Sequence, residues 1–158
     1  MPQKFYLTKI GLEKVKNEYE NLKQIKLAKT RGESPKIWHS EDLNPEYLTF
    51  QEDLSFLEAR LAELENILKN VELIKIPPKQ RQNIIDLGAK VLVESDGQSD
   101  EFEIIGTLEA NPSLGKISNE SPVGKALLGH RIGDIVVLSS PNKTIYKIKK
   151  IKYPTSLS

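Results

Sequence analysis

The sequence has no cysteine, and its 158 residues include only two histidines and one tryptophan. The lack of cysteine excludes disulfides and thiol chemistry, and so few histidines give no sign of a zinc site. No hydrophobic run approaches the length of a membrane-spanning helix, and the N-terminal residues lack the apolar core of a signal peptide. We therefore expect no membrane partner, and we take the cytoplasm as the default location.

The sequence also lacks an excess of charge of one sign, since 23 Lys and Arg stand against 22 Asp and Glu. Net charge therefore indicates neither nucleic acid nor a membrane surface as the partner, and any electrostatic function must be local. With 38% hydrophobic and 28% charged residues, the chain is long enough for one ordinary domain or two small ones. The high charged fraction argues against a single large core.

What the sequence does contain is a strict apolar repeat along residues 47–71. Its members alternate at steps of three and four, the spacing of a helix that packs along one seam. They are Tyr47, Phe50, Leu54, Leu57, Leu61, Leu64, Leu68 and Val71. The stripe that can cover this seam lies upstream, at Leu12, Val15, Tyr19, Leu22 and Ile25. Because two helices joined by a short connection run antiparallel, residues 1–74 are predicted to form a two-helix coiled-coil hairpin.

The connection between the two helices is the predicted tip of this hairpin. The first helix should end near Thr30, because Gly32 lowers helix propensity. Asn44 is suited to cap the second helix and Pro45 to occupy its first position, and the apolar pattern extends this helix to about Leu73. Roughly a dozen residues remain for the tip, a length typical of functional loops.

The second half of the chain differs in composition. Residues 75–83 contain two consecutive prolines and are predicted to form a linker. Residues 84–158 contain short β-rich runs separated by turn residues, and Asp96-Gly97 suits a hairpin between the first two runs. The runs are residues 90–94, 101–107, 134–138 and 144–151.

One short helix is predicted among these strands. Ser121 supplies its N-cap, Pro122 its first residue and Gly129 its end. The second half is therefore predicted to be a small antiparallel β domain with one short helix, and the whole chain is predicted to be of the α+β class.

Two sequence patterns carry a resemblance to a known family. Between residues 121 and 137, Ser-Pro is followed by Ala-Leu-Leu-Gly and then by Gly-Asp and apolar residues, and Asn44-Pro45-Glu46-Tyr47 opens the second helix. Both patterns, with the length and the domain order, resemble the GreA/GreB transcript-cleavage factors of bacterial RNA polymerase. The resemblance implies that the coiled coil enters the polymerase's secondary channel. It also implies that the C-terminal domain is FKBP-like (similar to FK506-binding protein) and docks at the channel's outer rim.

The resemblance further implies a mechanism for the tip. Family members present two acids that hold a second Mg²⁺ jointly with the polymerase, so that two metals assist the attack of water on backtracked RNA. Aligned without a gap, the two positions fall on Ser40 and Leu43. With a two-residue shortening, Asp42 matches one acid and Glu41 stands beside it as a replacement for the other. Glu41 and Asp42 are thus the expected catalytic and Mg²⁺-holding residues, with no metal bound by the isolated protein.

Further contacts are implied for both domains. Glu120, Ser121 and Pro122 match positions with which family members touch the polymerase rim, although Ser-Pro is equally an ordinary helix start. Late in the first helix, a basic run is expected to contact the nascent RNA. The alternative for this run is a solvated helix face, and for the tip acids a favourable interaction with the helix dipole. The basic residues are Lys26, Lys29 and Arg31.

We therefore expect a monomeric accessory factor, not itself an enzyme, that promotes cleavage of backtracked RNA so that elongation resumes. The alternative is a non-cleaving relative that occupies the same channel and modulates or inhibits transcription. A third hypothesis, a prolyl isomerase, rests only on fold analogy for the second domain. A proline pocket requires clustered aromatic residues, and this domain offers Phe102, Tyr146 and Tyr153.

Overall fold

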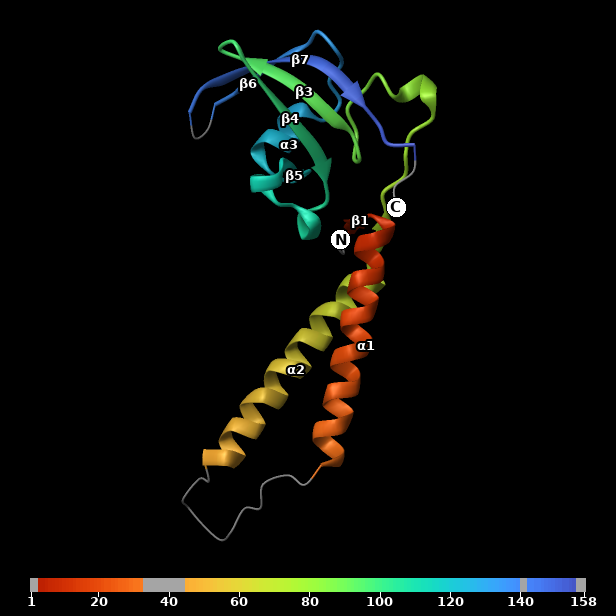
Figure 1. Ribbon diagram of the computed structural model, residues 1–158, viewed down its shortest axis with the longest axis vertical. Coiled ribbons are helices and arrows are strands. Elements are labelled where there is room, and N and C mark those ends of the chain that lie inside the picture. Colours follow the sequence, from red (N-terminus) through yellow and green to blue (C-terminus); the bar gives the residue numbers. More distant parts are fainter. Residues whose placement is uncertain (1–2, 33–44, 140–141, 156–158) are drawn as a thin grey trace. The chain divides into compact units, whose positions relative to one another are not determined.

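The computed structural model describes residues 3–32, 45–139 and 142–155 and divides into two compact units (Figure 1). We call Gln3–Leu12 with Val71–Ser158 the sheet unit, and Glu13–Asn70 the arm unit. Two long helices and a mostly antiparallel sheet make up these units, which confirms the α+β class. Within the described ranges, neither long helix has a stretch sufficiently apolar to cross a membrane.

The arm unit consists of helix α1 (Lys9–Arg31, of which the first residues belong to the sheet unit) and helix α2 (Pro45–Lys69), which run antiparallel. Helix α2 begins at Pro45 as predicted, since the fixed φ of proline suits the first helical position. Helix α1 ends at Arg31, close to the expected end at Thr30.

The predicted seam of α2 is confirmed in its central part. Leu61 and Leu64 are 8% and 0% exposed, whereas Tyr47, in the first turn of α2, is only half-buried. The next buried position is Ile67 and not Leu68, which is half-buried. The remaining seam positions are half-buried except for Ile25 of α1, which is exposed. These half-buried positions are Phe50, Leu54 and Leu57 of α2, with Leu12, Val15, Tyr19 and Leu22 of α1.

The predicted end of α2 at Leu73 is wrong, because the helix stops at Lys69. Strand β2 (Val71–Leu73) follows and pairs in parallel with β1 (Phe5–Leu7). Val71 therefore belongs to a strand and not to the helical seam. The apolar pattern continues through both elements, whereas the pairing that makes the strand comes from a distant part of the chain.

The described part of the sheet unit also contains a five-stranded sheet in the order β5-β4-β3-β7-β6. All four strands predicted from the sequence are present, and their neighbours pair antiparallel. Short strand β5 was not predicted and pairs in parallel with β4, so the sheet is not purely antiparallel. The strands are β3 (Lys90–Ser95), β4 (Gln98–Ile105), β5 (Lys116–Ser118), β6 (Ile135–Leu138) and β7 (Thr144–Lys152).

The turn between β3 and β4 has the conformation that its residues favour. Asp96 and Gly97 have φ values of 52° and 79°. Two consecutive positive φ values define the type I′ turn, whose twist matches that of the strands it joins. The predicted hairpin is therefore confirmed.

One α-helix, α3 (Pro122–Leu127), packs on the sheet and is the predicted short helix. Its last residue, Leu127, is fully buried in the core. The described part of the unit also contains three short 3-10 helices: η1 (Lys79–Arg81), η2 (Thr107–Glu109) and η3 (Pro112–Leu114). The buried core comprises Ile85, Ala89, Val91, Val93, Ile104, Leu127, Val136 and Ile148.

Candidate functional site

The two acids expected to act at the tip, Glu41 and Asp42, lie outside the described residues, as do Ser40 and Leu43. Among the residues that the structure does describe, no group of three or more His, Asp or Glu side chains is placed to hold a metal ion. The described candidate surfaces are therefore the turn that precedes α3 and the charged surface of the arm unit.

The turn before α3 is organised by Ser121. Its side-chain oxygen accepts a hydrogen bond from the Gly124 N–H at 3.1 Å and donates one to the Ser118 carbonyl at 2.7 Å. This is the N-cap geometry predicted from the sequence, with Pro122 at the first helical position. Gly124 is required here, because a Cβ on it would overlap the Ser118 carbonyl.

Glu120 is held on the same turn by two further residues. Its carboxylate accepts a hydrogen bond from the Thr107 hydroxyl at 3.0 Å, and its N–H donates to the Ser118 hydroxyl at 3.0 Å. The Thr107 and Ser118 hydroxyl oxygens are themselves 2.7 Å apart. Glu120 and Pro122 remain exposed. The three residues expected to touch a partner thus form a preorganised turn.

Sequence reasoning missed Thr107 and Ser118, which support this turn. Thr107 begins η2 and Ser118 ends β5. No local pattern links them, because their contact arises from the parallel pairing of β4 with β5. A short parallel strand has no sequence signature of its own.

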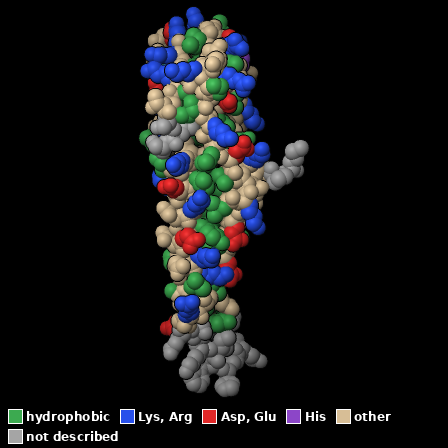
Figure 2. All heavy atoms as spheres, turned by 90° about the vertical axis from the view of Figure 1, so that its right-hand side faces the viewer, with side chains coloured by type: hydrophobic (Ala, Val, Ile, Leu, Met, Phe, Trp, Pro, Cys, Tyr) green, Lys and Arg blue, Asp and Glu red, His purple; other side chains and the backbone are tan. Residues whose placement is uncertain are grey.

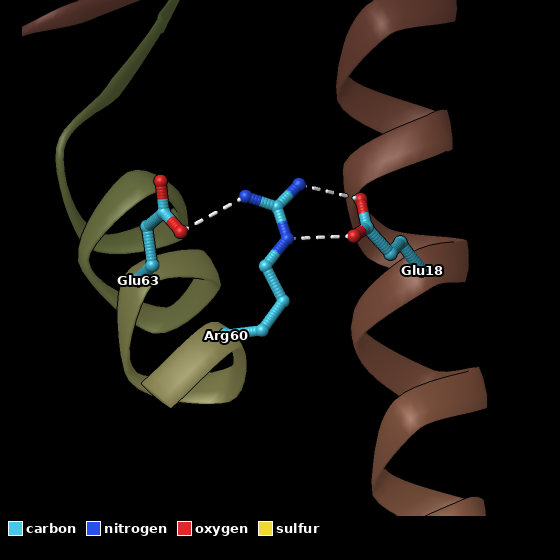
Figure 3. Close-up of polar contacts among 3 residues, drawn as sticks. All are labelled: Glu18, Arg60 and Glu63. Atoms are coloured by element: carbon cyan, nitrogen blue, oxygen red, sulfur yellow. Dashed lines mark hydrogen bonds and ion pairs between the residues drawn. The ribbon is translucent and has the colours of Figure 1, made fainter. Parts of the chain in front are cut away.

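The arm unit carries charges of both signs, and Figure 2 shows acidic and basic side chains intermixed on the face in view. Arg60 of α2 is central to one network, in which its Nε and Nη2 atoms donate to Glu18 of α1 at 2.7 and 3.0 Å (Figure 3). Its Nη1 atom lies 3.0 Å from the Glu63 carboxylate on α2. This two-point contact between Arg60 and Glu18 fixes one helix against the other.

These contacts change the ionisation of both partners. The hydrogen bonds from Arg60 hold the pKa of Glu18 below its ordinary value, although partial burial opposes this shift. Hydrogen bonds to Glu18 and Glu63 raise the pKa of Arg60. All three side chains are more than one third exposed, so water screens the network.

Replacing Arg60 with methionine is expected to lower the free energy of unfolding by about 1 kcal/mol at neutral pH. This value is the upper end of the range for exposed ion pairs, and we choose it because the contact is bidentate. Because the folded-state pKa of Glu18 is lowered, the stabilisation is complete above the unfolded pKa near 4.5 and is lost as the pH falls through the folded value. Urea unfolding followed by circular dichroism should show the two proteins converging in acid. A difference that persists when Glu18 is protonated would attribute the loss to packing of the Arg60 stem.

The basic residues expected to contact RNA occupy the distal half of α1. Lys26 lies 3.6 Å from Glu58, and Lys29 lies 3.4 Å from Asp53. Arg31 is exposed in the last helical turn and forms no ion pair within the described residues. Two of the three cations therefore form ion pairs between the helices. The alternative of a solvated helix face did not include these pairs.

The three aromatic residues considered for a proline pocket are engaged in packing. Phe102 and Tyr146 meet edge to face at 5.8 Å between ring centroids and pack against the core. The Tyr153 hydroxyl donates to the Ile84 carbonyl and accepts from the Asp86 N–H at 2.9 Å. Burial raises the pKa of this Tyr153 hydroxyl. This arrangement offers no support for a proline-binding pocket built from these three aromatic residues.

The sequence matches two family profiles that together span most of the chain. "Transcription elongation factor, N-terminal" matches residues 5–73, and "Transcription elongation factor, GreA/GreB, C-term" matches residues 80–153. The chain is 40% identical over 142 residues to "Transcription elongation factor GreA" of Thermomicrobium roseum, covering 88% of this chain and 90% of the relative. It is 40% identical over 152 residues to the protein of the same name from Acetivibrio thermocellus, covering 92% and 94%.

Among solved structures, the chain is similar to GreA factor homolog 1 (Gfh1) of Thermus thermophilus. The sequence identity is 28%, the TM-score is 0.42, and the match covers 95% of this chain and 99% of the other.

Proposed function

The chain belongs to the GreA/GreB family of transcription elongation factors, and from this membership we propose that it binds bacterial RNA polymerase through the secondary channel and promotes cleavage of backtracked nascent RNA. In this proposal it acts as a monomeric accessory factor in the cytoplasm, and the polymerase supplies the cleaving active site. The observation that carries the proposal is that one chain combines a helical hairpin with a separate sheet unit that presents a preorganised turn.

The length of the helical arm supports the proposal. Helix α2 contains 25 residues, which corresponds to about 37 Å at a rise of 1.5 Å per residue. In the sequence, the tip residues follow α1 and precede α2. A helical arm of this length supports the delivery of tip residues into a narrow channel.

Glu41 and Asp42 are the tip residues proposed to act in cleavage. Carboxylate oxygens are the ligands that Mg²⁺ takes in proteins, so the donor chemistry of this pair fits the ion. When held jointly with the polymerase, Mg²⁺ would stabilise the charge that develops as water attacks the RNA. The contribution of this chain is to place the two carboxylates beside the reacting phosphate.

The basic residues of distal α1 are proposed to contact the nascent RNA. The ion pairs of Lys26 with Glu58 and of Lys29 with Asp53 are exposed, and such pairs are weak. Either lysine can therefore exchange its carboxylate for an RNA phosphate at little cost. Arg31, at the end of α1 nearest the tip, is available for the same contact.

On the sheet unit, Glu120, Ser121 and Pro122 are proposed to contact the rim of the polymerase channel. The hydrogen bonds from Thr107 and to Ser118 fix this turn before any partner binds. Binding to a preorganised turn saves the entropy of ordering it, which supports a docking role.

The second candidate function is a non-cleaving modulator that occupies the same channel. The observation that favours it is the tip sequence, in which one acid aligns with the family pattern and its neighbour replaces the other. Both candidates share the same binding surfaces and differ in whether the tip carboxylates support cleavage.

Cleavage of RNA in backtracked elongation complexes separates the two candidates. RNA labelled at its 5′ end is incubated with polymerase, Mg²⁺ and the unmodified chain, and the shortened transcripts are resolved on a gel. We expect the unmodified chain to accelerate shortening, Asp42→Ala to lose most of this activity and Glu41→Ala to lose part of it. Glu52→Ala, which removes an exposed acid from α2, is the matched control and should keep full activity.

Binding to polymerase is measured in the same series by competition with a labelled copy of the chain. If the unmodified chain binds but does not accelerate shortening, the modulator is correct and the cleavage proposal is wrong. If it does not bind, both candidates fail.

A further inference from the structure

The first turn of α1 is held by a residue from a distant part of the sheet unit. Thr8 precedes the helix, and its hydroxyl oxygen accepts a hydrogen bond from the Gly11 N–H at 3.1 Å, as an N-cap does. Glu109, at the end of η2, accepts two hydrogen bonds from the same threonine. The Thr8 N–H donates at 2.8 Å and the Thr8 hydroxyl at 2.6 Å.

This arrangement completes a capping box with a carboxylate from elsewhere in the chain. In the usual box, a Glu or Gln at the third helical position reaches back to the N–H of the N-cap residue. Here Gly11 occupies that position and has no side chain, and the first turn of α1 contains no acid. Glu109 supplies the acceptor, and its charge also interacts favourably with the helix N-terminus.

Gly11 is the residue that makes room for this carboxylate. It is buried, and a Cβ on it would lie 2.5 Å from Glu109 Cδ, well inside contact distance. Glycine is unfavourable within a helix compared with alanine. Its presence at the third helical position is explained by the space that Glu109 occupies.

A second close approach holds the same segment against β1. A Cβ on Gly106, which precedes η2, would overlap the backbone carbonyl of Tyr6. Leu7, in the same strand, is 1% exposed, and its carbonyl accepts from the Ile74 N–H at 2.9 Å. The strand before α1 and the 3-10 helix that carries Glu109 are therefore packed backbone against backbone.

We propose that Glu109 is a positioning residue: acting through Thr8, it holds the start of α1, the helix that leads to the tip carboxylates, and so supports their action on the reacting RNA. The catalytic part of this inference rests on the proposed function. Catalysis is sensitive to such positioning, because a displacement of about 1 Å caused far from the chemistry can lower a rate by about two orders of magnitude.

A double-mutant cycle of melting temperatures tests the contact itself, independently of any activity. Gly11→Ala is expected to lower the melting temperature of the otherwise unmodified chain, because the new methyl group displaces the Glu109 carboxylate. In a Glu109→Ala background, the same substitution is expected to raise the melting temperature, since alanine is the better helix former. A change of the same sign in both backgrounds, whether up or down, would overturn the proposed contact.

Transcript cleavage tests the positioning role. We expect Glu109→Ala to lower the cleavage rate at saturating factor by about tenfold and to leave the half-saturating concentration unchanged. Glu109→Gln keeps one acceptor for Thr8 and should recover part of the rate. Glu101→Ala, which removes an exposed acid from β4, is the matched control and should behave like the unmodified chain.

Two outcomes would overturn the positioning role. One is a Glu109→Ala rate equal to that of Glu101→Ala, and the other is an effect confined to the half-saturating concentration, which indicates binding. Failure of the unmodified chain to stimulate cleavage would instead overturn the proposed function and with it the catalytic part. In that case the double-mutant cycle of melting temperatures still decides whether Glu109 caps α1.

Discussion

Leu64→Ala is expected to lower the free energy of unfolding by about 2–5 kcal/mol, the range for a buried leucine truncated to alanine. Leu64 is 0% exposed on α2, and Leu61 and Ile67, also buried, lie one turn away on either side. The loss combines the transfer free energy of the removed atoms with the cavity that they leave.

Phe56→Ala provides the matched control for this substitution. Phe56 lies on the same helix and is larger than leucine, but it is 77% exposed, so its loss should change stability by no more than about 0.5 kcal/mol. Urea unfolding followed by circular dichroism at 222 nm gives both values, and hydrogen exchange by mass spectrometry localises the loss to α2. Equal effects of the two substitutions would show that burial does not determine the stability of this helix.

Leu127→Ala is the second substitution with a large expected effect, again about 2–5 kcal/mol. Leu127 is 0% exposed and anchors α3 in the core of the sheet unit. Because the N-terminus of α3 carries Ser121 and Pro122, loosening the helix should also weaken the proposed binding to RNA polymerase. Stability and function are therefore expected to fall together in this variant.

Leu114→Ala is the control for the second substitution, because Leu114 of η3 is 69% exposed. Urea unfolding measures stability, and competition with a labelled copy of the unmodified chain measures polymerase binding at a temperature where every variant is folded. A Leu127→Ala protein that is destabilised but binds with full affinity would remove α3 from the proposed interface.

The elements that were predicted correctly are those specified by neighbouring residues. Asp96-Gly97 favours a two-residue hairpin on its own, because both residues accept a positive φ. Ser121 and Pro122 likewise define the start of α3 through the N-cap oxygen and the fixed φ of proline. Such local preferences are visible in the sequence and need no knowledge of the tertiary structure.

The errors arise where a distant partner decides the structure. Val71–Leu73 continues the apolar pattern of α2, but its pairing with Phe5–Leu7 makes it a strand. Strand β5 has three residues and exists through its pairing with β4. A three-residue strand is too short to show an alternating pattern, so both errors have the same cause.

In the candidate site, too, the residues set by local sequence were predicted and those set by distant contacts were not. Ser121 and Pro122 were identified from their own turn chemistry and from the resemblance, and the structure adds Thr107 and Ser118 as their supports. Glu109 could not be identified from the sequence, since its partner Thr8 is 101 positions away. The tip residues Glu41 and Asp42 remain a prediction that the cleavage experiment addresses.

The carboxylate of Glu109 also has a consequence for the order of folding during synthesis. Thr8 leaves the ribosome long before Glu109, so the first turn of α1 lacks its acceptor while the arm is being made. Contacts of such large sequence separation are slow to form, because the intervening chain must be closed into a loop first. The part of the protein that is translated first is thus completed late, after the ribosome has produced the beginning of the sheet.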